Sequence, residues 1–403
     1  MKKILLVSQY FWPETFRIND LALELIKLGY EVDVLTGKPN YPQGKIYENY
    51  GFFSHRKDNF HGVKIHRVPL IPRGNGNGVR LALNYLSYVF FSCLYILFCN
   101  RKYDVTLTFA ISPITQAYPA LLHKWKYKSK TLLWVQDIWP ESVSAAGQVK
   151  SKTVLNILNK LVKGIYRRVD SILVQSQAFI PSIEEKKIDK KKIRYVPNWA
   201  EDLFVNSASI DQNKFKNILP NGFIVMFTGN VGEAQDFESI LKAASLTVHK
   251  KEIKWVVVGD GRKKAWVESE IMRLGLQDTV KLLGSYPVDD MPSFFTYADA
   301  LLMSLKDEQV LALTIPSKLQ SYMAFGKPIV GMLNGIGSDI ISSAKCGYTA
   351  SAADYEQLAK NILDLYSESK NTLEIMGNNA KKYYQEHFSK DVVLKDLLQI
   401  IEE

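Results

Sequence analysis

The sequence is short of the residues that build disulfide frameworks and metal sites. Its three cysteines, Cys93, Cys99 and Cys346, are too few for a disulfide framework and fit a reducing compartment. The six histidines show no metal-ligand spacing, and the chain contains no strict Asp-x-Asp pair of the kind that can hold Mg²⁺ or Mn²⁺. These shortages exclude a disulfide-stabilised secreted scaffold and give no indication of a metal centre.

The first residues show only part of the pattern of a secretion signal. They begin "MKKILLV", but the chain turns polar after these apolar residues and offers no small-residue cleavage site. We therefore expect residues 4–8 to form a buried first strand. Together with the low cysteine content, this pattern favours a cytoplasmic protein.

Acidic residues are scarce in the first half of the chain. Residues 1–200 carry 30 Lys and Arg against 14 Asp and Glu, a net charge of +16, whereas residues 201–403 carry 21 against 27, a net charge of −6. A basic half joined to an acidic half indicates that one half faces a polyanion, such as nucleic acid, an anionic membrane or a phosphorylated substrate.

The length of 403 residues favours two domains.

One long apolar run lacks charge altogether. Residues 81–99, "LALNYLSYVFFSCLYILFC", contain no charged side chain and approach the length that spans a bilayer. Three interpretations are open: a spanning helix, a buried helix in the outer layer of a sheet, or a helix partly dipped into the membrane surface. The basic segments "HKWKYKSK" and "KGIYRR" support the third, because they could hold the first half at an anionic leaflet.

Strand and helix patterns alternate along most of the chain. Segments such as "KILLVSQ", "EVDVLTG" and "TLLWVQD" alternate with apolar-periodic helices, and a second such series begins at "FIVMFTGN". This rhythm predicts two doubly wound parallel sheets in tandem, with ligands at the carboxyl ends of the strands. We place the domains at residues 1–200 and 201–375, followed by a C-terminal helical segment, 376–403, that packs back on the first domain.

Two segments of the second half predict an anion site. In "FTGNVGEAQ", Gly229 and Gly232 allow backbone N–H groups to approach an anion where a strand enters a helix. In "TIPSKLQSYMAFGKPIVG", Thr314 is expected to cap a helix that has Pro316 in its first position, which places Ser317 and Lys318 in the first turn. Because both segments follow strands of one sheet, we expect them to grip a diphosphate together. A solvated surface lysine is the alternative explanation for Lys318.

The order of these segments resembles the glycosyltransferase family 4 enzymes, which have the GT-B fold of two Rossmann-like domains. The resemblance covers essentially the whole chain and rests on "GYEVDVLTGKPNYPQG", "WVQDIWPES", "YVPNWAE", "FTGNVGEAQ", "VVVGDG" and "PSKLQSYMAFGKPIVG". Within the family, the chain is similar to the N-acetyl-L-fucosaminyltransferases that build bacterial O-antigen and capsule repeats.

The resemblance implies a retaining glycosyltransferase that uses a UDP-sugar without a metal. Its acceptor is expected to be a polyprenyl-diphosphate-linked saccharide at the inner face of the plasma membrane, with no nucleic acid involved. In this reading Lys318 stabilises the leaving diphosphate. The donor site as a whole comprises Gly229, Asn230, Gly232, Glu233, Gln235, Tyr286, Glu308, Thr314, Ser317 and Lys318.

Several positions depart from the family pattern. The family usually has Arg and Lys in the phosphate loop, where this chain has Asn230 and Gln235. It also has two Glu separated by seven residues, where Leu313 and Ser321 stand here, and the second Glu normally binds ribose. Lys318 is expected to replace part of the missing loop charge.

Acceptor residues are expected at the strand ends of the first domain. Asp137 ends an apolar strand, where a carboxylate could orient or deprotonate an acceptor hydroxyl, although a turn or helix-cap Asp is the alternative. The other candidates are Glu14, Arg17, Tyr41 and Glu141. For Glu14 and Arg17 the alternative is a capped loop, and for Tyr41 it is simple packing.

Rival functions remain open at this point. A UDP-sugar 2-epimerase of similar two-domain shape would change the sugar nucleotide without an acceptor. The basic first half also allows a non-catalytic protein that binds membranes or nucleic acid, although no recognised nucleic-acid module is visible. A dinucleotide oxidoreductase is disfavoured, because no Gly-rich turn follows the first strand.

Overall fold

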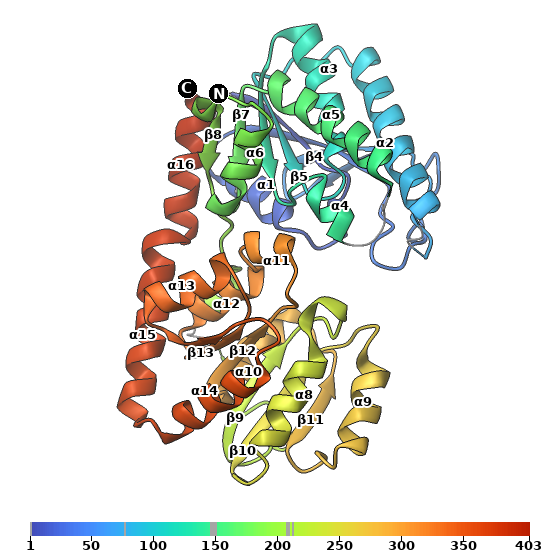
Figure 1. Ribbon diagram of the computed structural model, residues 1–403. Coiled ribbons are helices and arrows are strands. Elements are labelled where there is room, and N and C mark those ends of the chain that lie inside the picture. Colours follow the sequence, from blue (N-terminus) through green and yellow to red (C-terminus); the bar gives the residue numbers. More distant parts are fainter. Residues whose placement is uncertain (1, 76–77, 146–150, 207–209, 212) are drawn as a thin grey trace. The chain divides into compact units, whose positions relative to one another are not determined.

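The computed structural model describes residues 2–75, 78–145, 151–206, 210, 211 and 213–403 (Figure 1). Contacts divide the chain into two compact units, Met1–Val196 and Pro197–Glu403. Each unit contains one sheet, which confirms the predicted tandem of α/β domains. The predicted packing of the C-terminal segment on the first domain stays a prediction.

The first unit is built on an eight-stranded sheet. Its strand order is β3-β4-β2-β1-β5-β6-β7-β8, and β3 and β4 pair in the antiparallel sense. The strands are β1 (Lys3–Val7), β2 (Glu31–Gly37), β3 (Lys57–Phe60), β4 (Val63–Val68), β5 (Val105–Ala110), β6 (Lys130–Val135), β7 (Ser171–Val174) and β8 (Ile193–Tyr195). The main helices are α1 (Arg17–Lys27), α2 (Gly78–Phe98), α3 (Tyr118–Tyr127), α4 (Glu141–Ala145), α5 (Lys152–Arg168) and α6 (Ile180–Glu185). Strands β1, β5 and β6 are nearly continuous apolar runs because helices cover both faces of such a sheet.

The long apolar run forms helix α2, which lies beside α3 (Figure 1). One face of α2 packs on the first unit, where Asn84 Nδ2 donates to Ile71 O (2.6 Å) and Tyr88 Oη donates to Leu35 O (3.2 Å). The opposite face exposes Leu86 and Phe90. Helix α2 is long and apolar enough to cross a membrane, and 28% of its apolar window is buried.

The second unit is built on a six-stranded parallel sheet with the order β11-β10-β9-β12-β13-β14. Its strands are β9 (Phe223–Thr228), β10 (Ile253–Val258), β11 (Val280–Gly284), β12 (Ala300–Ser304), β13 (Ile329–Met332) and β14 (Gly347–Ala350). Its helices are α7 (Asp202–Val205), α8 (Phe237–Leu246), α9 (Lys264–Arg273), α10 (Met291–Tyr297), α11 (Gln309–Leu313), α12 (Ser317–Phe325), α13 (Ile336–Ala344), α14 (Tyr355–Ser367), α15 (Lys370–His387) and α16 (Lys390–Glu402). Helix α12 packs against α15 of the same unit.

Candidate active site

Lys318, in the first turn of α12, lies against the loop that follows β9. Its Nζ atom is 3.9 Å from the centroid of the Phe227 ring, and a Cβ placed on Gly229 would lie 2.7 Å from Lys318 Cε. Gly229 has a φ of +112°, which L side chains rarely adopt. The structure therefore brings Lys318 and Gly229 together at the carboxyl end of the sheet.

The environment of Lys318 is unusual for a lysine. Burial lowers the pKa of its ammonium to about 7, and no carboxylate pairs with it among the residues the structure describes. Lys318 is half-buried, and a cation partly removed from water without a partner carries a free-energy cost. An anion arriving at this point would supply the missing partner and raise the pKa again.

Tyr322, one turn further along α12, fixes the helix to the strand end. Its hydroxyl accepts a hydrogen bond from the backbone N–H of Thr228 (3.1 Å) and lies 3.1 Å from Thr228 Oγ1. Helix α12 ends at Gly326, whose φ of +83° suits a helix C-terminus. The sequence analysis did not assign this tethering role to Tyr322.

The start of α12 differs from the prediction. Pro316 is the residue that precedes the helix, not its first helical residue, and no side chain caps the helix. Thr314 ends α11 instead, and its hydroxyl donates to Val310 O (2.9 Å), so the predicted capping role of Thr314 is wrong. Ser317 is exposed in the first turn, where uncapped N–H groups remain.

Two backbone N–H groups of the loop after β9 already have hydrogen-bond acceptors, one in β10 and one within the loop. Gly229 N donates to Val258 O (2.8 Å), and Gly232 N donates to Gln235 Oε1 (3.2 Å). Gln235 therefore closes the loop on itself. The N–H groups of Gly229 and Gly232 already donate hydrogen bonds within the protein. We therefore expect an anion to be bound mainly by the first turn of α12 and by Lys318. Asn230 is exposed, and its amide packs against Gly232 and Gly261.

Two lysines that the sequence analysis missed flank this loop. Glu233 forms ion pairs with Lys263 (2.8 Å) and with Lys306, and hydrogen bonds from these lysines lower the pKa of its carboxyl to about 2. Lys263 follows β10 and Lys306 follows β12. The sequence analysis could have found these two lysines from their positions just after the ends of predicted strands. With the ionised Glu233 counted, the two lysines leave one net positive charge near the loop, although Asn230 and Gln235 carry none.

The remaining donor candidates lie at other strand ends of the second unit. Tyr286 follows β11 and packs against Phe215 and Phe294, at centroid distances of 5.4 and 4.9 Å. Glu308 precedes α11 with extended backbone and is partly exposed. Ser321, at the position of the family's second Glu, lies 3.4 Å from Glu201 Oε2.

In the first unit, Asp137 lines a cavity of about 300 Å³ at the carboxyl ends of β5 and β6. Its Oδ2 accepts hydrogen bonds from Ser112 N (3.1 Å) and Ser112 Oγ (3.0 Å), and Trp139 Nε1 donates to the same hydroxyl (3.1 Å). Burial raises the pKa of Asp137 in spite of the hydrogen bonds from Ser112. The carboxyl is thus held in one orientation, as expected of a group that positions a substrate hydroxyl.

Tyr41 and Arg73 line the same cavity as Asp137. The guanidinium carbon of Arg73 lies 5.0 Å from the centroid of the Tyr41 ring. Tyr10 and Tyr85 add further aromatic surface. The cavity therefore combines aromatic rings, which suit sugar faces, with one carboxyl group and one cation. The sequence analysis missed Arg73 because it lies in an irregular loop without a recognisable motif.

The other acceptor candidates lie elsewhere in the first unit. Glu14 is buried, and its Oε1 accepts from the backbone N–H groups of Asn40 (2.8 Å) and Tyr41 (2.7 Å); burial raises its pKa to about 7. This carboxyl anchors the loop that carries Tyr41. Arg17 opens α1. Glu141 lines a separate cavity and accepts from Lys186 Nζ (2.8 Å) and Ser182 Oγ (2.7 Å).

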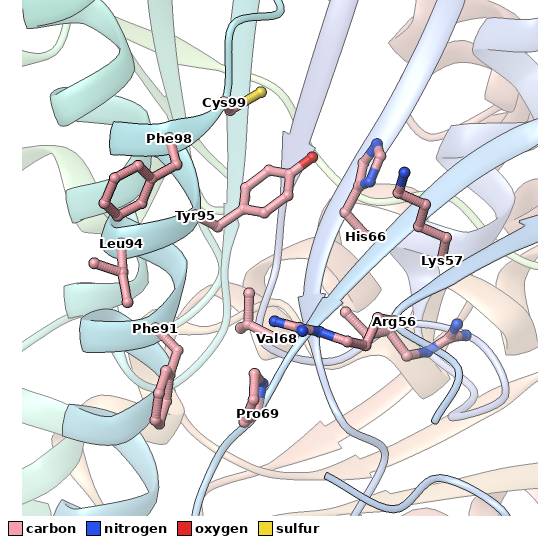
Figure 2. Close-up of a pocket in the computed structure, with 11 residues that line it drawn as sticks. Arg56, Lys57, His66, Val68, Pro69, Phe91, Leu94, Tyr95, Phe98 and Cys99 are labelled. Atoms are coloured by element: carbon pink, nitrogen blue, oxygen red, sulfur yellow. The ribbon is translucent and has the colours of Figure 1, made fainter. Parts of the chain in front are cut away.

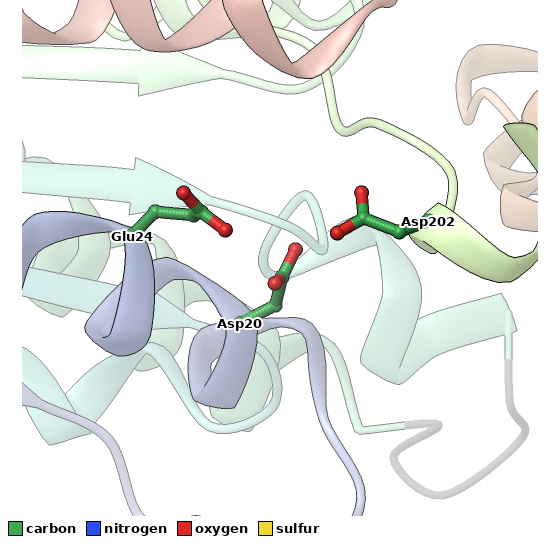
Figure 3. A group of neighbouring side chains, drawn as sticks. All are labelled: Asp20, Glu24 and Asp202. Atoms are coloured by element: carbon green, nitrogen blue, oxygen red, sulfur yellow. The ribbon is translucent and has the colours of Figure 1, made fainter. Parts of the chain in front are cut away.

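Figure 3 labels three further carboxylates, Asp20 and Glu24 on α1 and Asp202 at the start of α7. Each is accounted for within its own unit. Asp20 lies in the first turn of α1, where negative charge suits the helix dipole, and Glu24 pairs with Lys27 (2.8 Å). Asp202 pairs with Lys390 (2.7 Å). We assign no metal to these groups.

Comparison with known families matches both units. Residues 15–199 match the model of the glycosyl transferase 4-like domain, and residues 209–383 match that of glycosyl transferases group 1. The chain is 25% identical over 336 residues to the putative colanic acid biosynthesis glycosyl transferase WcaI of Escherichia coli, and 26% identical over 337 residues to the probable glycosyltransferase WbjE of Pseudomonas aeruginosa. Each alignment covers 80% of this chain and 81% of the relative.

The fold agrees with these matches. The crystal structure of Anabaena Alr3699/HepE in complex with UDP and glucose aligns with a TM-score of 0.69 and 16% identity, covering 100% of both chains. At this identity the similarity concerns the fold. With both family models, both relatives and the fold in agreement, the chain belongs to the family 4 glycosyltransferases and has the GT-B fold.

Proposed function

We propose that the protein transfers a sugar from a UDP-sugar to a lipid-diphosphate-linked saccharide during the synthesis of a bacterial surface polysaccharide, an O-antigen or a capsule. The observation that carries this proposal is the half-buried Lys318, which pairs with no carboxylate among the described residues and lies against Gly229. Similar proteins support it, because WcaI is named for colanic acid biosynthesis and HepE has been crystallised with UDP and with UDP-glucose. The sugar suggested by the family resemblance is N-acetyl-L-fucosamine.

On the donor side, the diphosphate is the leaving group and gains negative charge as the glycosidic bond to it breaks. Lys318 and the N–H groups in the first turn of α12 are aligned to stabilise that charge. Lys263 and Lys306, which share Glu233 as their partner, leave one net positive charge beside the loop. We propose that these groups replace a metal, and that the sugar is transferred with retention, as in the family that the chain resembles.

On the acceptor side, the cavity around Asp137 fits a saccharide attached to a diphosphate. Asp137 would accept a hydrogen bond from the attacking hydroxyl, Tyr41 would stack on a sugar, and Arg73 would contact the acceptor's diphosphate. Ser112 holds the Asp137 carboxyl for this task. The raised pKa of Asp137 strengthens it as a proton acceptor, since a carboxylate of higher pKa binds a proton more readily.

On the membrane side, we propose that the protein is cytoplasmic and associates peripherally with the inner face of the plasma membrane. The exposed face of α2 carries Leu86 and Phe90, which are 63% and 62% exposed, and Trp125 on α3 is 70% exposed. Lys126 binds the carbonyls of Leu97 (2.7 Å) and Cys99 (2.9 Å) at the end of α2. Apolar side chains beside basic ones are typical of an interfacial helix, and the buried face of α2 argues against a helix that spans the bilayer.

The test is transfer from a panel of UDP-sugars to a polyprenyl-diphosphate-linked saccharide, in EDTA, with the product analysed by mass spectrometry and NMR. The proposal predicts one extended saccharide with a retained anomeric configuration. A change in the UDP-sugar without an acceptor would instead support the epimerase. Activity that appears only when Mg²⁺ or Mn²⁺ is restored would overturn the metal-free mechanism.

A further inference from the structure

A second cavity of the first unit, of about 470 Å³, lies between α2 and the β3–β4 edge of the sheet (Figure 2). Its two sides differ in chemistry. Phe91, Leu94 and Phe98 come from α2, and Arg56 and Lys57 lie on the opposite side. Of the described residues that line the cavity, none is acidic. It shares no lining residue with the cavity of Asp137.

The cations of this cavity are of two kinds. Arg67 is held structurally, because it donates to Asp58 Oδ2 (2.9 Å) and to Trp12 O (2.7 Å). Arg56 and Lys57 are exposed, and neither pairs with a carboxylate in the part of the chain that the structure describes. Two exposed cations facing the apolar side of the cavity are complementary to a ligand with an anionic head and an apolar tail.

The apolar side continues into the exposed face of α2. Leu94 and Phe98 line the cavity and are also exposed, Phe98 at 78%. Phe52 lies 6.0 Å from Phe91 between ring centroids, and the adjacent Phe53 is 79% exposed. The cavity therefore opens within a surface that is already suited to the acyl region of a membrane.

We propose that this cavity binds one anionic phospholipid of the membrane surface, with its phosphate at Arg56 and Lys57 and an acyl chain along Phe91, Leu94 and Phe98. The inference rests on the proposed membrane association and adds a stoichiometric lipid site to it. The lipid of the sugar acceptor is a less suitable occupant, because the cavity of Asp137 has its own cation, Arg73. A phospholipid held here would align α2 along the membrane surface.

The test uses dihexanoyl phosphatidylglycerol below its micellar concentration, titrated calorimetrically into the full chain. The proposal predicts saturable binding of one lipid per chain and much weaker binding of dihexanoyl phosphatidylcholine. The double variant Arg56→Gln/Lys57→Gln should bind at least about tenfold more weakly. The matched control, Lys190→Gln/Lys191→Gln, removes the same charge from exposed positions of the same unit and should bind like the wild type.

The remaining outcomes separate this inference from the proposals on which it rests. If vesicles containing phosphatidylglycerol bind but the monomeric lipid does not, or if Arg56→Gln/Lys57→Gln binds the lipid normally, the cavity proposal is overturned and the membrane association stands. If vesicles do not bind either, both are overturned. Tighter binding of a short prenyl phosphate than of the phospholipid would assign the cavity to the acceptor lipid. Transfer to a water-soluble acceptor, assayed separately, reports on glycosyl transfer alone.

Discussion

The ammonium of Lys318 lies 3.9 Å from the ring centroid of Phe227, at the point where β9 ends. A ring face stabilises a cation only partly, by roughly 0.5–2 kcal/mol. The contact therefore holds the lysine in place while leaving most of the burial cost uncompensated. A bound anion would offset the remaining cost. We therefore expect Lys318 to affect both the stability of the free protein and its affinity for anions.

Lys318→Met should stabilise the protein, most strongly at low pH. Because burial lowers the pKa of Lys318 from 10.5 to about 7, the unfolded chain binds more protons than the folded one between these values. The free-energy cost of burying the charged ammonium is complete below pH 7 and disappears as the pH rises toward 10.5. At pH 6 we expect the variant to unfold at a higher temperature than the wild type, by about 2–4 °C for each kcal/mol gained in the free energy of unfolding. At pH 9.5 the difference should be smaller.

The control is Lys360→Met, which removes a lysine that is exposed on α14. It should show no pH-dependent gain. Equal unfolding temperatures of Lys318→Met and wild type at both pH values would show that the Lys318 ammonium is well solvated.

Gly229→Ala should weaken donor binding. An added Cβ would lie 2.7 Å from Lys318 Cε and 3.0 Å from Nζ, so the lysine would have to move. We expect the dissociation constant for UDP to rise by about tenfold or more, which corresponds to the loss of one charge-assisted contact. Calorimetric titration measures this directly.

Gly275→Ala is the matched control for this substitution. Gly275 also has a positive φ, of +66°, but an added Cβ there meets nothing within 4 Å. Both variants place an alanine at a positive φ, and only Gly229→Ala should lose UDP affinity. Similar losses in the two would point to general destabilisation and away from Lys318.

Asp137→Asn should reduce turnover while leaving UDP binding intact. Asn can still accept the hydrogen bonds from Ser112, but it no longer accepts a proton from the acceptor hydroxyl. Loss of such a group typically costs about 10²–10⁴ in rate. Steady-state transfer assays, run beside the exposed Asp189→Asn control, separate this effect from a general loss of activity. Wild-type turnover in Asp137→Asn would leave its carboxyl with a structural role only.

Leu86→Ser/Phe90→Ser should weaken binding to anionic vesicles by more than tenfold. Each apolar side chain removed from the interface costs roughly 1.5–3 kcal/mol when it is fully buried, and less when burial is partial. Vesicle co-sedimentation measures the change. Met272→Ser/Ile375→Ser removes comparably exposed apolar side chains from the second unit and should have no effect. Equal binding of all these proteins would contradict the membrane role of α2.

Much of the fold and part of the site could be predicted from the sequence. Buried strands of a parallel sheet read as apolar runs, so the strands at the centre of both sheets were found, whereas the short polar edge strand β3 was missed. Gly229 and Lys318 were predicted to meet because both follow strands of one sheet at their carboxyl ends. That argument requires only the order of elements.

Contacts between side chains of segments without a regular sequence pattern could not be predicted in the same way. Glu141 pairs with Lys186 and Arg73 stacks on Tyr41 across irregular segments, where no periodicity relates the two positions. Gln235 occupies the N–H of Gly232 through a bond that the motif did not reveal. Such contacts depend on rotamers and loop paths, which only the folded chain determines.

The most direct test of the central claim is calorimetric titration of wild type and Lys318→Ala with UDP in EDTA, at pH 8 and in buffers of different ionisation enthalpy. We predict metal-free binding by the wild type with uptake of up to one proton, because the diphosphate raises the lowered pKa of Lys318. Lys318→Ala should bind more weakly and without that uptake. Equal affinity and equal proton uptake in the two proteins would contradict the assignment of Lys318 as the group that binds the diphosphate.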